Sequence, residues 1–232
     1  ALRMTQTNWT PLDRNAIAKR VAKDIPEGWY VNLGIGVPTL VADNVPADRE
    51  VIFHAENGIL GMGPYPEEKD IDWTLINAGK KPITAIKGAS FFDHAWSFGI
   101  VRGGHLELCV LGGYQVAPNG DLANWARDAD DPLPAIGGAM DLAAGAQRIF
   151  VMMTHNDKNG GFKVVENCTY PLTGPGIVKK VFTDLCVLDV QDGRFIVTDM
   201  IDGLSREELQ ARTGATLHFA DDVAILADRA AA

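Results

Sequence analysis

Glu56 stands where a strand is expected to end and a glycine-rich stretch begins, a suitable place for ligand chemistry. An apolar run precedes it, and glycines follow at positions 58, 61 and 63. Glycine lets the backbone approach a ligand closely, and open α/β sheets bind ligands beyond the C-terminal ends of their strands. The same residues also suit a plain hairpin turn on Asn57-Gly58, with Glu56 as an ordinary surface acid. The local pattern leaves both interpretations open.

A second glycine-rich turn, at Gly34 and Gly36, could bind an anion. It precedes a short helix expected to begin at Pro38, so N–H groups at the helix start would face the ligand. Glu56 lies 20 residues after Gly36, where a dinucleotide-binding fingerprint has the acid that binds the ribose. Against this, Thr39 replaces the third glycine and the helix is too short for a full crossover. A tight strand-to-helix turn is the structural alternative.

Two further segments carry groups that could stabilise negative charge. Gly137, Gly138 and Ala139 lead into a predicted short helix, where N–H groups could bind an oxyanion; simple helix entry is the alternative. Lys80 follows a turn and could meet a carboxylate or a phosphate, or could be a solvated lysine. Only the fold decides whether these groups reach the carboxylate.

Composition argues against several other classes of protein. The formal net charge of −9 over 232 residues argues against binding to nucleic-acid phosphates, which depends on clustered lysine and arginine. The five histidines form no metal-binding pattern, and GxSxG, P-loop and kinase motifs are missing from the sequence. We therefore expect no metal and no permanently bound cofactor.

The cysteines and apolar runs predict a cytoplasmic protein. Cys109, Cys168 and Cys186 are widely spaced without a CxxC pair, which is typical of reduced thiols; Cys109 lies in an apolar run that suits the core. No apolar run approaches the ~18 residues that span a bilayer. The polar N-terminus lacks a signal-peptide core. Met4 suits a native start preceded by three cloning-derived residues, and a trimmed natural terminus is the alternative.

Periodicity and breakers predict the elements that position these groups. Helices are expected at 12–25 (capped by Asp13), 38–44, 140–146 and 205–213 (a capping box of Ser205 and Glu208). Strands are expected at 29–33, 51–55, 83–86, 106–111, 149–153, 178–183, 185–190 and 195–198. The 83–86, 106–111 and 149–153 runs suit strands buried on both faces.

These elements predict an α/β fold with an open, mixed or mainly parallel sheet flanked by helices. We expect one domain over residues 11–225, with flexible ends at 1–10 and 226–232. The proline- and glycine-containing stretch 128–138 predicts a long loop and no domain boundary.

Read together, the motifs resemble the B subunit of the class I coenzyme A transferases, which include the succinyl-CoA:3-oxoacid and 3-oxoadipate enzymes. The resemblance runs from about residue 10 to 220. It is carried by NLGIG at 32–36, ENG at 56–58, GMGP at 61–64, INAGK at 76–80, RGGH at 102–105, GDLANW at 120–125, GGAMDL at 137–142, PLTG at 171–174 and TDL at 183–185.

The resemblance implies that Glu56 is the catalytic glutamate, which forms a covalent glutamyl-CoA thioester with coenzyme A taken from succinyl-CoA. It implies that the N–H groups of Gly138 and Ala139 are oxyanion donors. It also implies that a separate A subunit completes the enzyme, as A2B2. The remaining residues that it places near the active site or bound CoA are Asn32, Gly34, Gly36, Asn57, Lys80 and Gly137.

One segment of the sequence differs from many acetoacetate-type members of the family, and it bears on the identity of the acceptor acid. An acidic insert and the run LPAI at 133–136 precede the GGAMDL motif, and this variant looks more like the 3-oxoadipate enzymes of aromatic catabolism than the acetoacetate enzymes. A dicarboxylic acceptor needs an extra cation, which Lys80, Lys81, Arg102 or the A subunit could supply. A dinucleotide-binding oxidoreductase and a non-catalytic scaffolding protein are the rival interpretations.

Overall fold

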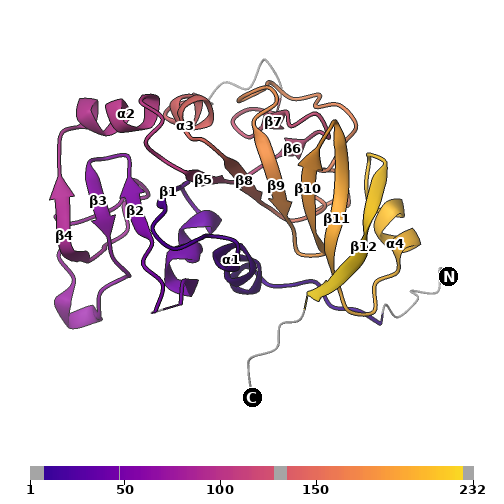
Figure 1. Cartoon of the computed structure of the whole chain (residues 1–232), viewed down its shortest axis with the longest axis horizontal. Coiled ribbons are helices and arrows are strands. Elements are labelled where there is room, and N and C mark those ends of the chain that lie inside the picture. Colours follow the sequence, from indigo (N-terminus) through magenta and orange to yellow (C-terminus); the bar gives the residue numbers. More distant parts are fainter. Residues whose placement is uncertain (1–7, 47, 128–134, 227–232) are drawn as a thin grey trace.

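The computed structural model describes residues 8–46, 48–127 and 135–226, and ten of its strands form one sheet (Figure 1). Their order is β12-β11-β10-β9-β8-β5-β1-β2-β3-β4. The predicted α/β fold with an open, mixed sheet is confirmed. Within the described ranges, no helix is long and apolar enough to cross a membrane.

The centre of the sheet is parallel and buried. Its strands, in sheet order, are β9 (Val178–Phe182), β8 (Ile149–Met152), β5 (Leu108–Leu111), β1 (Tyr30–Leu33) and β2 (Ile52–Ala55). All residues of β5 and β8 are buried, as their uninterrupted apolar runs predicted.

Both ends of the sheet turn antiparallel. Beyond β2, the sheet continues with the antiparallel strands β3 (Ile59–Met62) and β4 (Ala85–Phe91). Beyond β9, it continues with the antiparallel strands β10 (Cys186–Gln191) and β11 (Arg194–Ile201). The last strand on that side, β12 (Leu217–Leu226), lies parallel to β11. A separate ribbon pairs β6 (Gln115–Val116) with β7 (Leu122–Ala123).

Short helices flank the sheet. They are α1 (Arg14–Lys23), α2 (His94–Arg102), α3 (Ala139–Gly145) and α4 (Arg206–Ala211), with 3-10 helices η1 (Val37–Asn44) and η2 (Glu68–Asp70). In Figure 1, α2 and α3 lie on the opposite side of the central strands from α1. Right-handed crossovers place η1, between β1 and β2, and α3, between β5 and β8, on opposite faces, because the chain moves along the sheet in opposite directions in the two connections. Helix α1 packs against η1. The predicted caps are present: Asp13 accepts from the N–H of Ala16 at 2.8 Å, and Ser205 and Glu208 form a capping box.

Several elements differ from the sequence predictions, and β3, β6 and β7 were not expected as strands. The strand expected at 83–86, buried on both faces, is instead β4, which begins at Ala85, lies at the sheet edge and is mostly exposed. Helix α2 was missed, although Asp93 caps it by accepting from the N–H of Trp96 at 2.8 Å. Strand β12 was also missed, because charged residues interrupt its apolar pattern.

The predicted domain limits can be compared with the structure only in part. Residues 1–7 and 227–232 lie outside the described residues, as does most of the 128–138 loop. Trp9 packs against the core, and Leu226 is the last residue of β12. A single domain over 11–225 therefore stays a prediction.

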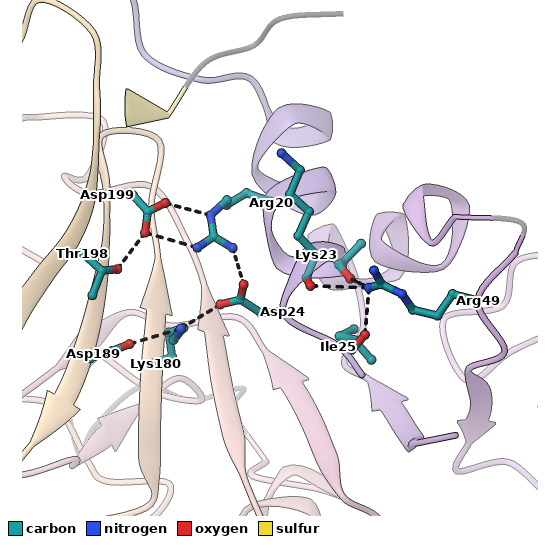
Figure 2. Close-up of polar contacts among 10 residues, drawn as sticks. Arg20, Lys23, Asp24, Ile25, Arg49, Lys180, Asp189, Thr198 and Asp199 are labelled. Carbon is teal, nitrogen blue, oxygen red and sulfur yellow. Dashed lines mark hydrogen bonds and ion pairs between the residues drawn. The ribbon is translucent and has the colours of Figure 1, made fainter. Parts of the chain in front are cut away.

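A network of ionic hydrogen bonds ties α1 to the antiparallel end of the sheet (Figure 2). Arg20 donates from Nε and Nη2 to the two carboxylate oxygens of Asp199, at 3.1 and 3.2 Å, and from Nη1 to Asp24 at 2.5 Å. Lys180 bridges Asp24 at 2.7 Å and Asp189 at 3.2 Å. The Arg20 and Asp199 side chains are only 17% and 11% exposed, so little water could replace either partner.

Replacing Arg20 by Met should lower the free energy of unfolding by about 2–4 kcal/mol, because Asp199 would keep a mostly buried charge without its bidentate partner. Urea unfolding of the two proteins measures the difference. As a control, Lys69→Met removes an ion pair with Glu67 in which both side chains are 75% exposed, and it should change stability little. Equal effects of the two substitutions would contradict this role for the network.

Candidate active site

The C-terminal ends of the central strands form the crevice of an open α/β sheet. From β1 the chain passes to β2 on one side, while β5 pairs with β1 on the other. Ligands bind at such switch points in open sheets. Glu56 directly follows β2 at this position, as the sequence predicted.

A cavity of about 720 Å³ opens at these strand ends. Its volume lies in the range of small-molecule sites, about 300–1,000 Å³. Six of the predicted site residues line it: Gly34, Gly36, Glu56, Gly137, Gly138 and Ala139. Segments far apart in the sequence therefore meet at one cavity.

Asn32 holds the Glu56 carboxylate through a hydrogen bond from the buried side of the site. It lies in β1 and is fully buried, and its Nδ2 donates to Glu56 Oε2 at 3.0 Å. Asn32 does not line the cavity itself. Its hydrogen bond uses one carboxylate oxygen of the half-buried Glu56 and leaves the other available to a ligand.

His54 supports Asn32 and has a defined tautomer. Its Nδ1 lies 3.0 Å from Asn32 Nδ2, and since an amide nitrogen only donates, Nδ1 must accept. The proton is therefore on Nε2, which lies 2.9 Å from Ser97 Oγ on α2. Burial lowers the pKa of His54 from 6.5 to about 4, so the ring is neutral at physiological pH.

Cys109 completes this buried group and is not a nucleophile. Its Sγ lies 3.6 Å from Asn32 Oδ1 in a donor geometry. Burial, and secondarily the Glu56 charge, raise the pKa of the Cys109 thiol well above its ordinary value. The thiol stays protonated, and the interpretation of Cys109 as a core residue is confirmed.

The turn after Glu56 is indeed a hairpin, which joins β2 to β3. Gly58 has φ of 125°, and a Cβ there would clash with the carbonyl oxygen of Phe92. Only glycine fits this position. The hairpin and the site coexist, since Glu56 is half-buried and bonded to Asn32 rather than freely solvated.

Asn57 and Lys80 are not brought to the cavity wall. The exposed Asn57 donates from Nδ2 to the carbonyl of Ile76 at 2.7 Å, which ties the hairpin to the loop that carries Lys80. Lys80 is exposed, with φ of 61°. A Cβ on the neighbouring Gly79 would lie 3.9 Å from Ile35, which lines the cavity, so this loop lies close to the cavity.

Two cations that sequence reasoning missed do line the cavity, Arg14 and Lys163. The lysines and arginine proposed from the sequence lie elsewhere: Arg102 pairs with Asp141 at 2.7 Å, and the Lys80–Lys81 loop lies outside. No pattern around Lys163 could have indicated its position, because it depends on non-local pairing.

Comparison with known proteins identifies the family of the chain. A family model described as coenzyme A transferase matches residues 14–211, and the chain belongs to that family. The resemblance seen in the sequence is thus confirmed.

Two relatives and one solved structure define the match further. The B subunit of the 3-oxoadipate CoA-transferase of Acinetobacter baylyi is 53% identical over 206 residues, 89% of this chain and 95% of that protein. The B subunit of the succinyl-CoA:3-ketoacid coenzyme A transferase of Helicobacter pylori is 47% identical over 87% of this chain and 97% of that one. The acyl-CoA transferase YdiF of Escherichia coli O157:H7 shares the fold, with a TM-score of 0.71 at 18% identity; the match covers 95% of this chain and only 46% of that one.

The tautomer and charge of His54 can be tested directly. Long-range ¹H–¹⁵N spectra should show a neutral ring with the proton on Nε2, titrating near pH 4 instead of 6.5. Because the folded-state pKa is depressed, the contribution of neutral His54 to stability is complete above pH 6.5 and is lost as the pH falls toward 4. A proton on Nδ1, or a midpoint near 6.5, would contradict the hydrogen-bond chain.

Proposed function

We propose that this chain is the B subunit of an enzyme that transfers CoA from succinyl-CoA to a 3-oxo acid, with 3-oxoadipate as the favoured acceptor, through a glutamyl-CoA thioester on Glu56. The observation that carries the proposal is the half-buried carboxylate on the cavity wall, held by the buried Asn32. Coenzyme A and its thioesters are substrates, and no resident cofactor or metal takes part.

The free oxygen of Glu56 attacks the succinyl thioester carbonyl, the C–S bond breaks, and CoA leaves as the thiolate. The product is a mixed anhydride of Glu56 and succinate. The thiolate then attacks the glutamyl carbonyl, the C–O bond to succinate breaks, and succinate leaves. The acceptor acid runs the same steps in reverse and departs as its CoA thioester.

Both attacks place negative charge on a carbonyl oxygen, which needs donors in the cavity. Gly138 and Ala139 are proposed for this, with Gly137, whose φ is 55°, shaping the turn. The Ala139 N–H now donates to the carbonyl of Ile136 at 3.3 Å, a long hydrogen bond. An oxyanion would compete with a weak partner there.

CoA would enter past the loop that carries Lys80. Lys80 and Asn57 are not among the residues that line the cavity, which suits contacts to the distal part of CoA. Gly34 and Gly36 form the adjacent wall. A Cβ on Gly34 would lie 3.0 Å from the carbonyl oxygen of Val110, so this turn must pack tightly against β5.

The choice of 3-oxoadipate, and with it a role in aromatic catabolism, rests on the sequence variant before Gly137 and on the higher identity to a relative named for that acid, 53% against 47%. Transfer to acetoacetate or a related 3-oxo acid is the alternative. The two acceptors differ by a second carboxylate, which the cavity cations could recognise.

The proposed partner is the A subunit of a CoA-transferase, in an A2B2 cytoplasmic enzyme. The two relatives are named as B subunits, and the chain spans about half the length of YdiF. The exposed edge strand β4 and its surroundings carry large apolar side chains, Trp73, Phe91 and Trp96, which are 70%, 64% and 70% exposed. Such a surface is typical of a protein interface.

The dinucleotide alternative has less support. The segment after Gly36 is a short 3-10 helix rather than the long helix of a βαβ unit, and Glu56 is bonded to Asn32. Substitution of Glu56 distinguishes a catalytic chain from a scaffolding one, because only a catalytic Glu56 is required for activity.

In the complex with the A subunit, Glu56→Gln should lower kcat for CoA transfer by at least about 10³-fold, since the amide cannot form the anhydride. Glu207→Gln on α4, an exposed site far along the chain, is the matched control and should retain activity. Initial rates of 3-oxoadipyl-CoA and of acetoacetyl-CoA formation measure both the effect and the preferred acceptor. Transferase activity that survives Glu56→Gln would support the scaffolding interpretation instead.

A further inference from the structure

Lys163 presents a partly buried ammonium group at the wall of the cavity. Its backbone is fixed, because its carbonyl accepts from the N–H of Val116 in β6 at 2.9 Å. Its Nζ lies 3.5 Å from Thr154 Oγ1, just beyond the end of β8. Both Lys163 and Thr154 line the cavity, so the cation has a defined place relative to the strand ends.

Among the residues that the structure describes, this ammonium group lacks a close carboxylate. Across the described ranges, no Asp or Glu oxygen lies within 4.0 Å of Lys163 Nζ. The nearest influences are Asp157 and Asp184, and both have other partners. Asp157 accepts from the N–H groups of Asn159 and Gly161, each at 2.7 Å, and Asp184 accepts from the N–H of His155 at 2.6 Å.

The surroundings of Lys163 favour an incoming anion. Burial lowers the pKa of the Lys163 ammonium group, an effect that Asp184 and Asp157 oppose and that Arg127 reinforces. Arg127 stacks over the ring of Tyr114, 5.4 Å from its centroid, and Tyr114 lines the cavity. A desolvated cation with no ion-pair partner among the described residues gains most from a bound carboxylate.

We propose, building on the function proposed above, that Lys163 binds the distal carboxylate of dicarboxylic acyl groups in the cavity. Succinyl and 3-oxoadipyl groups occupy the cavity in turn during one cycle, and each ends in a carboxylate remote from the thioester carbon. An acetoacetyl group ends in a methyl group. Lys163 is thus a specificity-determining residue that selects dicarboxylic over monocarboxylic substrates.

A lysine suits the two chain lengths. The 3-oxoadipyl chain places its carboxylate two carbons further from the thioester than the succinyl chain does. A flexible four-carbon stem carrying a point charge can follow this change, whereas a rigid, forked guanidinium fits one geometry best. Arg14, the other cation on the cavity wall, is exposed at the start of α1 and serves as the comparison.

The test uses the complex with the A subunit and measures single-turnover formation of the Glu56 thioester from succinyl-CoA and from acetoacetyl-CoA. In Lys163→Met, the ratio of the two rate constants (succinyl over acetoacetyl) should fall about 10- to 100-fold, the range expected for a lost charged hydrogen bond. Lys163→Arg should recover much of that ratio. Lys179→Met, on an exposed position of β9, should leave it unaltered.

An unaltered ratio in Lys163→Met, or an equal loss of rate with both thioesters, would overturn the assignment. A drop in the ratio found in Arg14→Met but not in Lys163→Met would also overturn it and assign the carboxylate to Arg14. If the unsubstituted complex forms no Glu56 thioester from either substrate, the proposed function itself fails, a result distinct from failure of the Lys163 assignment.

Discussion

The hydrogen bond from Asn32 Nδ2 to Glu56 Oε2 is the interaction on which the proposed chemistry depends. A glutamate at the tip of a hairpin would ordinarily sample several rotamers in water. Here a fully buried amide, itself held by His54 and Cys109, fixes one carboxylate oxygen. The side chains of Asn32, His54 and Cys109 are all uncharged, so they position the Glu56 carboxylate without neutralising its charge.

The fold provides this arrangement through the order of its central strands. Asn32, Cys109 and His54 come from β1, β5 and β2, which are adjacent in the sheet, and Ser97 reaches His54 from α2. Three parallel strands therefore present side chains to one point below the cavity. The ionic network around Arg20 lies apart from this centre and joins α1 to the antiparallel strands (Figure 2).

An acidic protein that takes anionic substrates must bind them by local interactions. Its net charge is −9, yet the cavity is lined by Arg14 and Lys163 and by the backbone at Gly137 and Gly138. The long-range field does not favour an anionic substrate, so short-range donors must supply the affinity. This explains why overall composition says little about the ligand.

Sequence patterns predicted the parts of the molecule that depend on neighbouring residues. The buried runs of β5 and β8, the caps of α1 and α4, and the position of Glu56 after β2 all follow from local periodicity or turn chemistry. The edge strand β4 and the terminal β12 were misplaced or missed because their pairing partners, not their own residues, define them. Lys163 was missed for the same reason, whereas Asn32 was found only through resemblance to a known family.

The central claim is that Glu56 carries coenzyme A covalently, and peptide mapping by mass spectrometry tests it most directly. The complex with the A subunit is mixed with succinyl-CoA, quenched in acid and digested. We predict a CoA thioester on the peptide that contains Glu56, which disappears when 3-oxoadipate is added before the quench. An adduct on another residue, or turnover without any adduct, would contradict it.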